Sequence, residues 1–324
     1  MTTQTKIAVG PDLAAIRKAH SRIAPRIHRT PVLTSSSLNE MAGAEIYFKC
    51  ENLQKTGSFK IRGATNAVFS LSNEEAKNGV VAPSSGNHAA ALALAARWRG
   101  IPAFLIMPSN SSATKKRAVQ AYGGQITECE PNMASREATA AEVMKRTGGH
   151  LLHPYNDERV IAGQGTAAIE LLEQVPDLDI VITPVSGGGL LSGTAIATKS
   201  LRPEVRVIGG EPRNADDTSR SLASGKIEPV AKTETIADGL RASLCPLTFG
   251  ILRERVDEIS LVTEEEIIST MLLLWERMKI VVEPSGAVAA GPVLLRKIKA
   301  QGKKVGVILS GGNLDLHQLP WMHR

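Results

Sequence analysis

Short apolar runs that end directly in a turn recur along this chain, and helices follow most of these turns. The run at residues 79–83 leads into a polar turn, and an alanine-rich helix is predicted from about Ala89 to Trp98. Continuous Val and Ile runs that alternate with helices predict an α/β protein with a mostly parallel sheet covered on both faces. Five runs carry the pattern: residues 79–83, 103–107, 179–185, 205–210 and 304–309.

The domain organisation follows from length and continuity. A chain of 324 residues is long for one hydrophobic core and predicts two domains. No repeat, low-complexity tract or Pro/Gly/Ser linker separates two halves, so we expect one domain to be inserted into the other. Residues 79–148 have their own strand–helix rhythm and are the predicted small domain. Residues 1–78 and 149–324 would form a discontinuous large domain that binds the cofactor.

One helix near the C-terminus can be predicted closely from its own residues. Thr263 stands at its start and Glu266 follows three residues later, the spacing of a capping box. Apolar residues then recur every three or four positions and predict one buried stripe. The stripe consists of Ile267, Met271, Leu274 and Met278.

Composition argues against several classes of function. The 38 basic and 32 acidic residues give a net charge of +6, and the basic residues are scattered without interleaved aromatic residues. A nucleic-acid surface is therefore not expected, whereas an anionic small ligand fits the mild excess. No apolar run approaches the roughly 18 residues of a membrane span, so no membrane partner is expected.

The cysteines and the N-terminus indicate a compartment. Cys50, Cys129 and Cys245 are far apart and form no CxxC pair, which argues against a disulfide framework or a thiolate zinc site. The first residues lack the basic-then-apolar pattern of a signal peptide. We therefore expect a cytoplasmic protein.

Lys60 lies in Gly57-Ser58-Phe59-Lys60, at a predicted junction between a turn and a helix. A free lysine amine has a pKa of roughly 10.4 and is a poor nucleophile at neutral pH. Burial or a nearby cation lowers that pKa and lets the amine form a Schiff base. Most lysines beside glycines are solvated surface residues, and this segment alone leaves both interpretations open.

A glycine-rich turn follows the apolar run 179–185. In Ser186-Gly187-Gly188-Gly189, the glycines let consecutive backbone N–H groups point at one centre, beside the positive end of a helix. Such a cradle typically holds phosphate. The turn matches neither GxGxxG nor the Walker sequence, so a dinucleotide or nucleoside triphosphate is not favoured. A flexible turn without a ligand is the alternative.

Two other turns carry polar side chains at predicted strand ends. Ser84, Ser85 and Asn87 supply two hydroxyls and an amide that could hold a carboxylate or a phenolic oxygen. Helix capping alone would also explain them. Ser310 begins the turn after the last apolar run, at the carboxyl end of a strand, where open α/β sheets bind ligands.

Together, the three turns and the early lysine resemble the fold type II pyridoxal-phosphate enzymes, and more narrowly the serine/threonine dehydratase and serine racemase family. The segments Gly57-Ser58-Phe59-Lys60-Ile61-Arg62-Gly63-Ala64 and Ser84-Ser85-Gly86-Asn87-His88 appear in order and at the family's spacing. The likeness runs from Thr30 to Asn313. It implies a tryptophan synthase β-like α/β fold with two open, mostly parallel sheets and helices on both faces. It also implies pyridoxal 5'-phosphate as cofactor, an amino-acid substrate and a homodimer.

The resemblance implies roles for individual residues. Lys60 would be the Schiff-base lysine, and Asn87 would bond the ring oxygen of the cofactor. Ser310 would face the pyridine nitrogen, and Glu283, as a buried carboxylate near the ring, would help set its protonation. Phe59, Ser186, Gly187, Gly188, Gly189 and Leu190 complete the implied cofactor site, the last five of them around the phosphate.

A serine beside the pyridine nitrogen has a chemical consequence. It does not keep the ring protonated as a carboxylate would, so the ring is a weaker electron sink. That suits prompt β-elimination or racemisation. By the resemblance, Lys60 would take the Cα proton from one face, and Ser85 would serve the other face in a racemase. The implied substrate-binding residues are Ser84, Ser85, Asn87, His88 and Arg136.

Arg136 is the residue that best separates the subfamilies. On pattern alone, an arginine in a helix is more often exposed and solvated. In serine racemases and hydroxyaspartate dehydratases, however, an arginine in a similar Ser-Arg-Glu context reaches the site. A guanidinium there could pair bidentately with a second carboxylate of the substrate.

An acidic turn at residues 211–217 suggests a divalent cation. Glu211 and Asp217, with a carbonyl between them, could give oxygen ligands to Mg²⁺ or Ca²⁺, although a solvated acidic turn is the commoner explanation. The segment resembles the cation site of the racemase branch. That resemblance would place Glu211, the carbonyl of Ala215 and Asp217 on a magnesium or calcium ion with a structural role.

These observations predict a pyridoxal-phosphate ammonia-lyase, or dehydratase, of a small β-hydroxy amino acid. L-Serine, L-threonine or threo-3-hydroxyaspartate would lose water and give a 2-oxo acid and ammonia. The alternative is a serine racemase with side β-elimination activity. A cofactor-carrying binding protein of the same fold is a third possibility, but binding alone has no need of Lys60.

Overall fold

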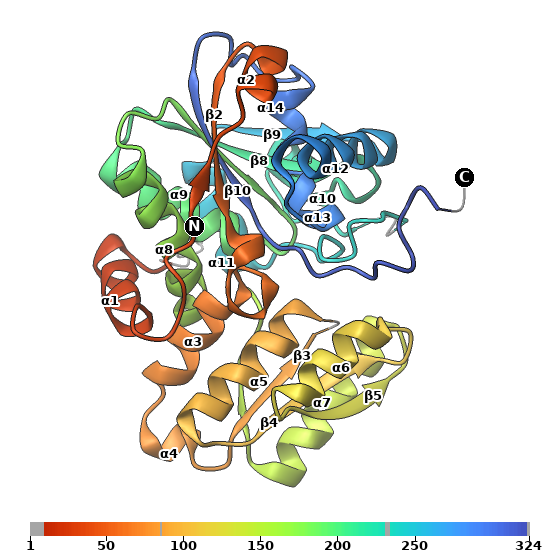
Figure 1. Ribbon diagram of the computed structural model, residues 1–324. Coiled ribbons are helices and arrows are strands. Elements are labelled where there is room, and N and C mark those ends of the chain that lie inside the picture. The colour runs from red at the N-terminus through yellow and green to blue at the C-terminus, as the bar shows by residue number, and fades with distance from the viewer. Residues whose placement is uncertain (1–9, 85, 231–233, 323–324) are drawn as a thin grey trace.

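The computed structural model describes residues 10–84, 86–230 and 234–322, and it is built on two sheets (Figure 1). The larger sheet has the strand order β1-β2-β10-β7-β8-β9, and within it only β1 runs antiparallel to its neighbour. The smaller sheet has the order β5-β4-β3-β6 and is parallel throughout. The predicted α/β architecture with mostly parallel sheets is therefore confirmed. The strands are β1 (Val32–Leu33), β2 (Glu45–Cys50), β3 (Val80–Pro83), β4 (Ala103–Pro108), β5 (Gln125–Cys129), β6 (His150–Leu151), β7 (Ile180–Pro184), β8 (Arg206–Pro212), β9 (Glu258–Val262) and β10 (Lys304–Leu309).

Helices surround both sheets, and in Figure 1 the smaller sheet with α5 to α7 lies below the larger one. None of the helices in the described ranges is long and apolar enough to span a membrane. The α-helices are α1 (Leu13–Ile23), α2 (Ser36–Ala42), α3 (Lys60–Ser70), α4 (Asn73–Ala76), α5 (Asn87–Arg99), α6 (Ala113–Ala121), α7 (Met133–Thr147), α8 (Glu158–Gln174), α9 (Gly189–Leu201), α10 (Asp217–Ser224), α11 (Pro246–Arg255), α12 (Glu264–Met278), α13 (Pro284–Ala287) and α14 (Gly291–Leu294). Short 3-10 helices are η1 (Glu51–Leu53), η2 (Lys55–Gly57) and η3 (Arg213–Ala215).

The predicted boundary of the small domain can be compared with the strands of the smaller sheet. Those strands come from residues 80–151, so β6 follows the predicted boundary at residue 148 and still pairs with β3. The division into residues 79–148 and the remaining two segments stays a prediction.

Helix α12 begins as its sequence predicts. The backbone N–H of Thr263 donates to Glu266 Oε2 at 2.7 Å, and the backbone N–H of Glu266 donates to Thr263 Oγ1 at 3.3 Å. These reciprocal bonds satisfy two donors that a helix start leaves free. The predicted stripe faces the core: Ile267, Met271 and Leu274 are buried, and Met278 packs against them partly exposed.

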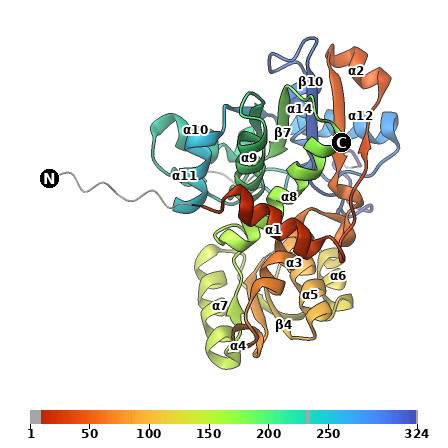
Figure 2. The same cartoon turned by 90° about the vertical axis from the view of Figure 1, so that its left-hand side faces the viewer.

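Helix α3 lies where the two sheets meet, against α5 on one side and α8 on the other (Figures 1 and 2). Its packing on α8 brings the backbones unusually close. A Cβ added to Gly163 would lie 2.6 Å from both the Gly63 Cα and the Arg62 carbonyl oxygen. Any side chain larger than hydrogen at Gly163 would therefore push α3 away from α8.

Candidate active site

The segment that carries Lys60 is fastened to the end of β10. The Phe59 N–H donates to the Ser310 carbonyl oxygen at 2.9 Å, and Ser58 forms an isolated antiparallel bridge with Gly311. Lys60 is then the first residue of α3. The carboxyl end of β10 is the edge at which open parallel sheets bind ligands, so the lysine lies at that edge.

The electrostatics around Lys60 favour neutral groups. Burial lowers the pKa of Lys60 to about 8, and the charge of Glu283 opposes that fall. Burial, together with the positive charge of Lys60, also lowers the pKa of His88 to about 3 and that of His153 to about 4. Both histidines are therefore neutral near pH 7, and part of the Lys60 population is a free amine that can act as a nucleophile or a base.

Glu283 is buried against the turn that follows β10. Asn87 Nδ2 donates to Glu283 Oε1 at 2.7 Å, and Asn313 Nδ2 donates to Asn87 Oδ1 at 3.0 Å. Glu283 Oε2 has no hydrogen-bond partner among the described residues. Burial raises the pKa of Glu283 to about 7, against the charge of Lys115, which lowers it. The carboxyl group can thus accept or give a proton near neutral pH.

The glycine-rich turn opens α9 as predicted. Gly188 has φ +88° and is the N-cap of the helix, a conformation that L side chains rarely adopt. A Cβ on Gly187 would lie 2.5 Å from the ring of Tyr155. Ser186 Oγ is held by the loop opposite, because it accepts from the Ala242 N–H at 2.9 Å and donates to the Ala242 carbonyl at 3.1 Å. The turn therefore keeps bare backbone at a helix N-terminus, the arrangement that suits a phosphate.

Tyr155 and His153 are site residues that the sequence analysis missed. Their rings are 4.5 Å apart in an edge-on arrangement, and Tyr155 covers the glycine-rich turn. Burial raises the pKa of Tyr155 to about 12, so the phenol stays protonated. Both residues follow β6, and polar or aromatic residues after a predicted strand were the signal used for the other turns. Strand β6 itself was not predicted, because a two-residue strand is too short to recognise from sequence.

Ser84, in the turn before α5, uses its hydroxyl within the turn and the first turn of the helix. Ser84 Oγ accepts from the Gly86 N–H at 3.3 Å and from the Ala89 N–H at 3.2 Å. Its hydroxyl therefore takes part in capping the helix, the alternative interpretation of this turn. Ser85 lies outside the described residues.

Arg136 is in the second turn of α7 and is half-buried. Its Nε is buried and has no hydrogen-bond partner among the described residues. Its positive charge acts on Tyr155 and works against the burial that raises the pKa of that phenol. A buried guanidinium nitrogen without an acceptor is costly, and an anionic group beside Tyr155 would satisfy it.

The two carboxylates proposed for the cation, Glu211 at the end of β8 and Asp217 at the start of α10, are buried rather than solvated. Glu211 accepts from the backbone N–H groups of Thr218 at 2.8 Å and Ser219 at 2.9 Å, and Asp217 Oδ2 has no partner among the described residues. Burial raises the pKa of Glu211 to about 8 and that of Asp217 to about 7. No cluster of three or more His, Cys, Asp or Glu side chains that could hold a metal occurs in the described ranges. A cation here would therefore need carbonyl or water ligands besides the two acids.

The residues present fit pyridoxal phosphate. Phe59, Lys60, Asn87, Glu283 and Ser310 meet at the end of β10, and Tyr155 and His153 connect this group to the turn that begins α9. The side-chain-free backbone of residues 187–189 at the start of α9, and the lack of a partner for Glu283 Oε2 among the described residues, are the observations that favour a bound group. Leu190 is buried in the first turn of α9.

Comparisons with known proteins agree with this geometry. The family model "Pyridoxal-phosphate dependent enzyme" matches residues 23–311. A beta-hydroxyaspartate dehydratase of Paracoccus denitrificans is 51% identical over 303 residues, which cover 94% of this chain and 96% of that protein. A serine racemase of Arabidopsis thaliana is 50% identical over 313 residues, 95% of each chain. The structure of maize serine racemase superposes with a TM-score of 0.93 at 47% identity and covers 95% of each chain.

Proposed function

Because this chain belongs to the pyridoxal-phosphate dependent enzyme family, we propose that it removes water from a small β-hydroxy amino acid, giving a 2-oxo acid and ammonia. The chain is a pyridoxal-phosphate enzyme of the dehydratase or racemase type, as its relatives at 50% and 51% identity indicate. The observation that carries the proposed dehydration is the state of the Lys60 amine. Its pKa of about 8, beside Glu283, leaves part of it unprotonated and able to accept a proton near pH 7.

The proposed roles follow from the contacts. When bound, pyridoxal phosphate supplies an electron sink that acidifies the Cα–H of the amino acid. Lys60 Nζ would hold the cofactor and, as a free amine, would accept the Cα proton of the amino acid. Asn87 and Glu283, bonded to each other at 2.7 Å, would orient the ring. The N–H groups of the turn 186–189 would hold the phosphate, and Ser310 would face the pyridine nitrogen.

The buried Nε of Arg136 supports a substrate with two carboxylates. It has no acceptor among the described residues, and a second carboxylate could pair bidentately with the guanidinium. We therefore propose 3-hydroxyaspartate as the preferred substrate over serine and threonine. We expect Ser84, Asn87 and His88, at the start of α5, to bind the first carboxylate.

Racemisation of serine is the second candidate. The 50% identity to a serine racemase favours it, and Ser85 would have to act on the face opposite Lys60. Substrate handedness would then be lost without loss of the hydroxyl group. The two reactions differ in product and can be measured together.

A divalent cation, Mg²⁺ or Ca²⁺, is a further part of the proposal. The unpartnered Asp217 Oδ2 and the buried Glu211 would supply carboxylate oxygens, and Ala215 its carbonyl. The charge of Asp217 reaches Tyr155, so the cation would also steady the loops beside the glycine-rich turn. A homodimer and the division into two domains remain predictions.

A substrate panel tests the function directly. The holoenzyme is incubated with serine, threonine and threo-3-hydroxyaspartate in both configurations, and 2-oxo acid and enantiomer composition are measured in the same samples. The proposal expects 2-oxo acid, most rapidly from 3-hydroxyaspartate. Conversion of one serine enantiomer into the other, without 2-oxo acid, would replace dehydration with racemisation as the main reaction.

A further inference from the structure

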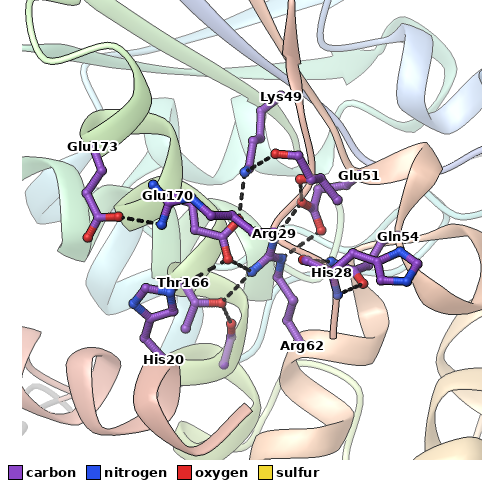
Figure 3. A network of polar contacts seen from close by, with 12 residues as sticks. His20, His28, Arg29, Lys49, Glu51, Gln54, Arg62, Thr166, Glu170 and Glu173 are labelled. Atoms are coloured by element: carbon purple, nitrogen blue, oxygen red, sulfur yellow. Dashed lines mark hydrogen bonds and ion pairs between the residues drawn. The ribbon is translucent and has the colours of Figure 1, made fainter. Parts of the chain in front are cut away.

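Arg62 lies on the side of α3 that faces away from Lys60. Two residues along a helix correspond to a turn of about 200° around its axis, so the two side chains point in nearly opposite directions. Lys60 faces Glu283 and the histidines, whereas Arg62 is completely buried between Glu51 and Glu170 (Figure 3).

Every N–H of the Arg62 guanidinium has an acceptor. Arg62 Nε and Nη2 donate to the two carboxylate oxygens of Glu51 at 2.7 and 2.8 Å. Arg62 Nη1 and Nη2 donate to the two oxygens of Glu170, both at 2.8 Å, and Nη1 also reaches Thr166 Oγ1 at 3.1 Å. Two bidentate pairs on one guanidinium fix its plane as well as its position.

Lys49 completes the network from β2. Its Nζ donates to Glu170 Oε2 at 2.6 Å, to Gln174 Oε1 at 2.8 Å and to the Thr30 carbonyl at 2.8 Å, so all three of its protons are used. Burial alone would raise the pKa of Glu170, but its bonds to Arg62 and Lys49 outweigh burial and lower it. We call Lys49, Glu51, Arg62 and Glu170 the α3 network; it has two positive and two negative groups.

The α3 network joins three elements directly behind the Lys60 segment. Glu51 belongs to η1 after β2, Arg62 to the first turn of α3, and Glu170 to α8. At the same crossing, Gly63 and Gly163 bring the helix backbones together. Close backbone packing limits the distance between the helices, and the paired carboxylates limit rotation and sliding of α3.

We propose that Arg62, held by Glu51, Glu170 and Lys49, is a positioning residue that fixes the rotation of α3 and thereby aims the Lys60 amine. This inference rests on the proposed role of Lys60. A buried ion network is a weak source of stability, because well-packed apolar residues often stabilise as much. What the network does provide is a fixed orientation of the Arg62 side chain. Arg62 is only two residues from Lys60, so a fixed Arg62 also fixes the part of α3 that carries the reacting amine.

The test compares three variants of the holoenzyme. Arg62→Lys keeps the charge but cannot form two bidentate pairs. Lys49→Met/Glu170→Met removes one charge of each sign, so that Arg62 keeps Glu51 as its counter-charge while the two Arg62 N–H groups that donate to Glu170 lose their acceptors. Ile169→Ala is the matched control, because it opens a cavity in the same helix, next to Glu170, within the cluster that packs on α1.

Four measurements are made on each variant. Stability is measured in urea, and kcat and KM are measured with the substrate. Reduction traps the cofactor on Lys60, and mass spectrometry gives the trapped fraction and its position. The absorbance of the lysine-bound cofactor is followed against pH to give its midpoint. For the two network variants we expect kcat to fall about 10- to 100-fold with KM within about threefold, because a small misplacement of a reacting group is costly. We also expect slower trapping and a displaced pH midpoint. Ile169→Ala should lose stability but keep the wild-type midpoint, trapping and kcat.

The outcomes separate the two proposals. Network variants that match Ile169→Ala in trapping, midpoint and kcat would show that the α3 network only stabilises the fold, and the positioning role would be wrong. Should Arg62→Lys fail to fold, the charge-balanced double variant decides the question by the same measurements. If the wild-type protein traps no cofactor on Lys60, the proposed function fails first, and the inference fails with it.

Discussion

The two sides of the first turn of α3 differ in whether their buried ionisable groups have partners. On one side, all the donors of Arg62 are paired, and the pKa of Glu170 is lowered so that it stays ionised. On the other side, the amine of Lys60 has no ion pair or hydrogen bond among the described residues, and its pKa falls to about 8. Glu283, with one unpartnered oxygen, has a pKa raised to about 7.

Burial is common to both sides, so burial does not explain the difference. Partner geometry does: its ion pairs raise the pKa of Arg62 and lower that of Glu170, so both stay charged, whereas the pKa values of Lys60 and Glu283 move toward neutrality. Lys49 is intermediate, because burial lowers its pKa although Glu170 and Glu51 oppose that change.

Arg136 Nε and Asp217 Oδ2 are also buried and have no partner among the described residues, and the charges of both side chains act on Tyr155. The comparison therefore predicts that removing one member of the fully paired group lowers stability and displaces Lys60, whereas removing an unpartnered group changes ligand binding or reaction at little cost in stability.

The largest expected effect is that of Lys60→Ala. Removing the amine should lower dehydration by at least about 10⁴-fold, because both cofactor attachment and the base are lost. Stability in urea should be unchanged or higher, since an unpaired buried amine disappears. The control is Lys55→Ala, which removes a lysine over the Trp98 ring at 5.2 Å. A large loss of stability in Lys60→Ala would break the comparison.

Arg62→Met should have the next largest effect, and it should lower stability as well as the kcat that depends on the position of Lys60. It leaves Glu51 and Glu170 without the guanidinium, and removing one partner of a buried ion pair costs about 3–5 kcal/mol. The free energy of unfolding in urea measures this. Arg29→Met is the matched control, because the Arg29–Glu173 pair at 2.8 Å is about half-exposed and is worth less than about 1 kcal/mol. Equal losses in the two variants would contradict the distinction.

Arg136→Ala tests an unpartnered cation. We expect kcat/KM for threo-3-hydroxyaspartate to fall about 100-fold, because the second carboxylate loses its bidentate partner. Turnover of threonine should change by less than about threefold, since threonine has no such group. The stability of the protein should hardly change. Equal losses for the two substrates would remove Arg136 from carboxylate recognition.

Cation binding at the acidic turn should depend on pH. Without a cation, the raised pKa values of Glu211 and Asp217, about 8 and 7, stabilise the fold at low pH, and that contribution is lost as the pH rises through 7 and 8. Mg²⁺ or Ca²⁺ should offset the loss, so chelation should lower Tm more at pH 8.5 than at pH 6. Binding at 100 times Kd is worth about 2.7 kcal/mol. Asp217→Asn should abolish the response and Asp216→Asn should keep it.

The smallest effect is expected for Glu283→Gln. The negative charge of Glu283 raises the pKa of Lys60, so its removal should lower that pKa below about 8, by roughly half a unit to one unit. The pH dependence of Lys60 labelling by an amine-directed reagent, read by mass spectrometry, measures the shift. A rise in the pKa of Lys60 would mean that Glu283 acts through packing rather than through charge.

Much of the fold could be predicted from local patterns. The continuous apolar runs predicted β3, β4, β7, β8 and β10, since strands buried on both faces have uniform sequences. Strand β2 was missed because exposed Glu45 precedes buried Ile46 and the run is short. The capping box of α12 was predicted in detail, because it depends on residues only three apart.

The site was predictable where its residues follow strands, and it was not where contacts are long-range. Lys60 and the turn 186–189 carry local signals of their type. Nothing in the sequence shows that Arg62 meets a glutamate 108 residues away, or that Tyr155 covers Gly187. Such pairings depend on how helices cross, and periodicity does not encode the crossing.

The position of β10 has a consequence for how this protein is made. Strand β10 (Lys304–Leu309) comes last in sequence among the described strands, yet it is inserted between β2 and β7 in the middle of the larger sheet. During synthesis, β2 and β7 therefore each have an open edge until residues 304–309 have left the ribosome. Long-range parallel pairing of this kind is slow and prone to aggregation. Lys60 receives its neighbours at that late step, so a truncated nascent chain has the lysine without its site.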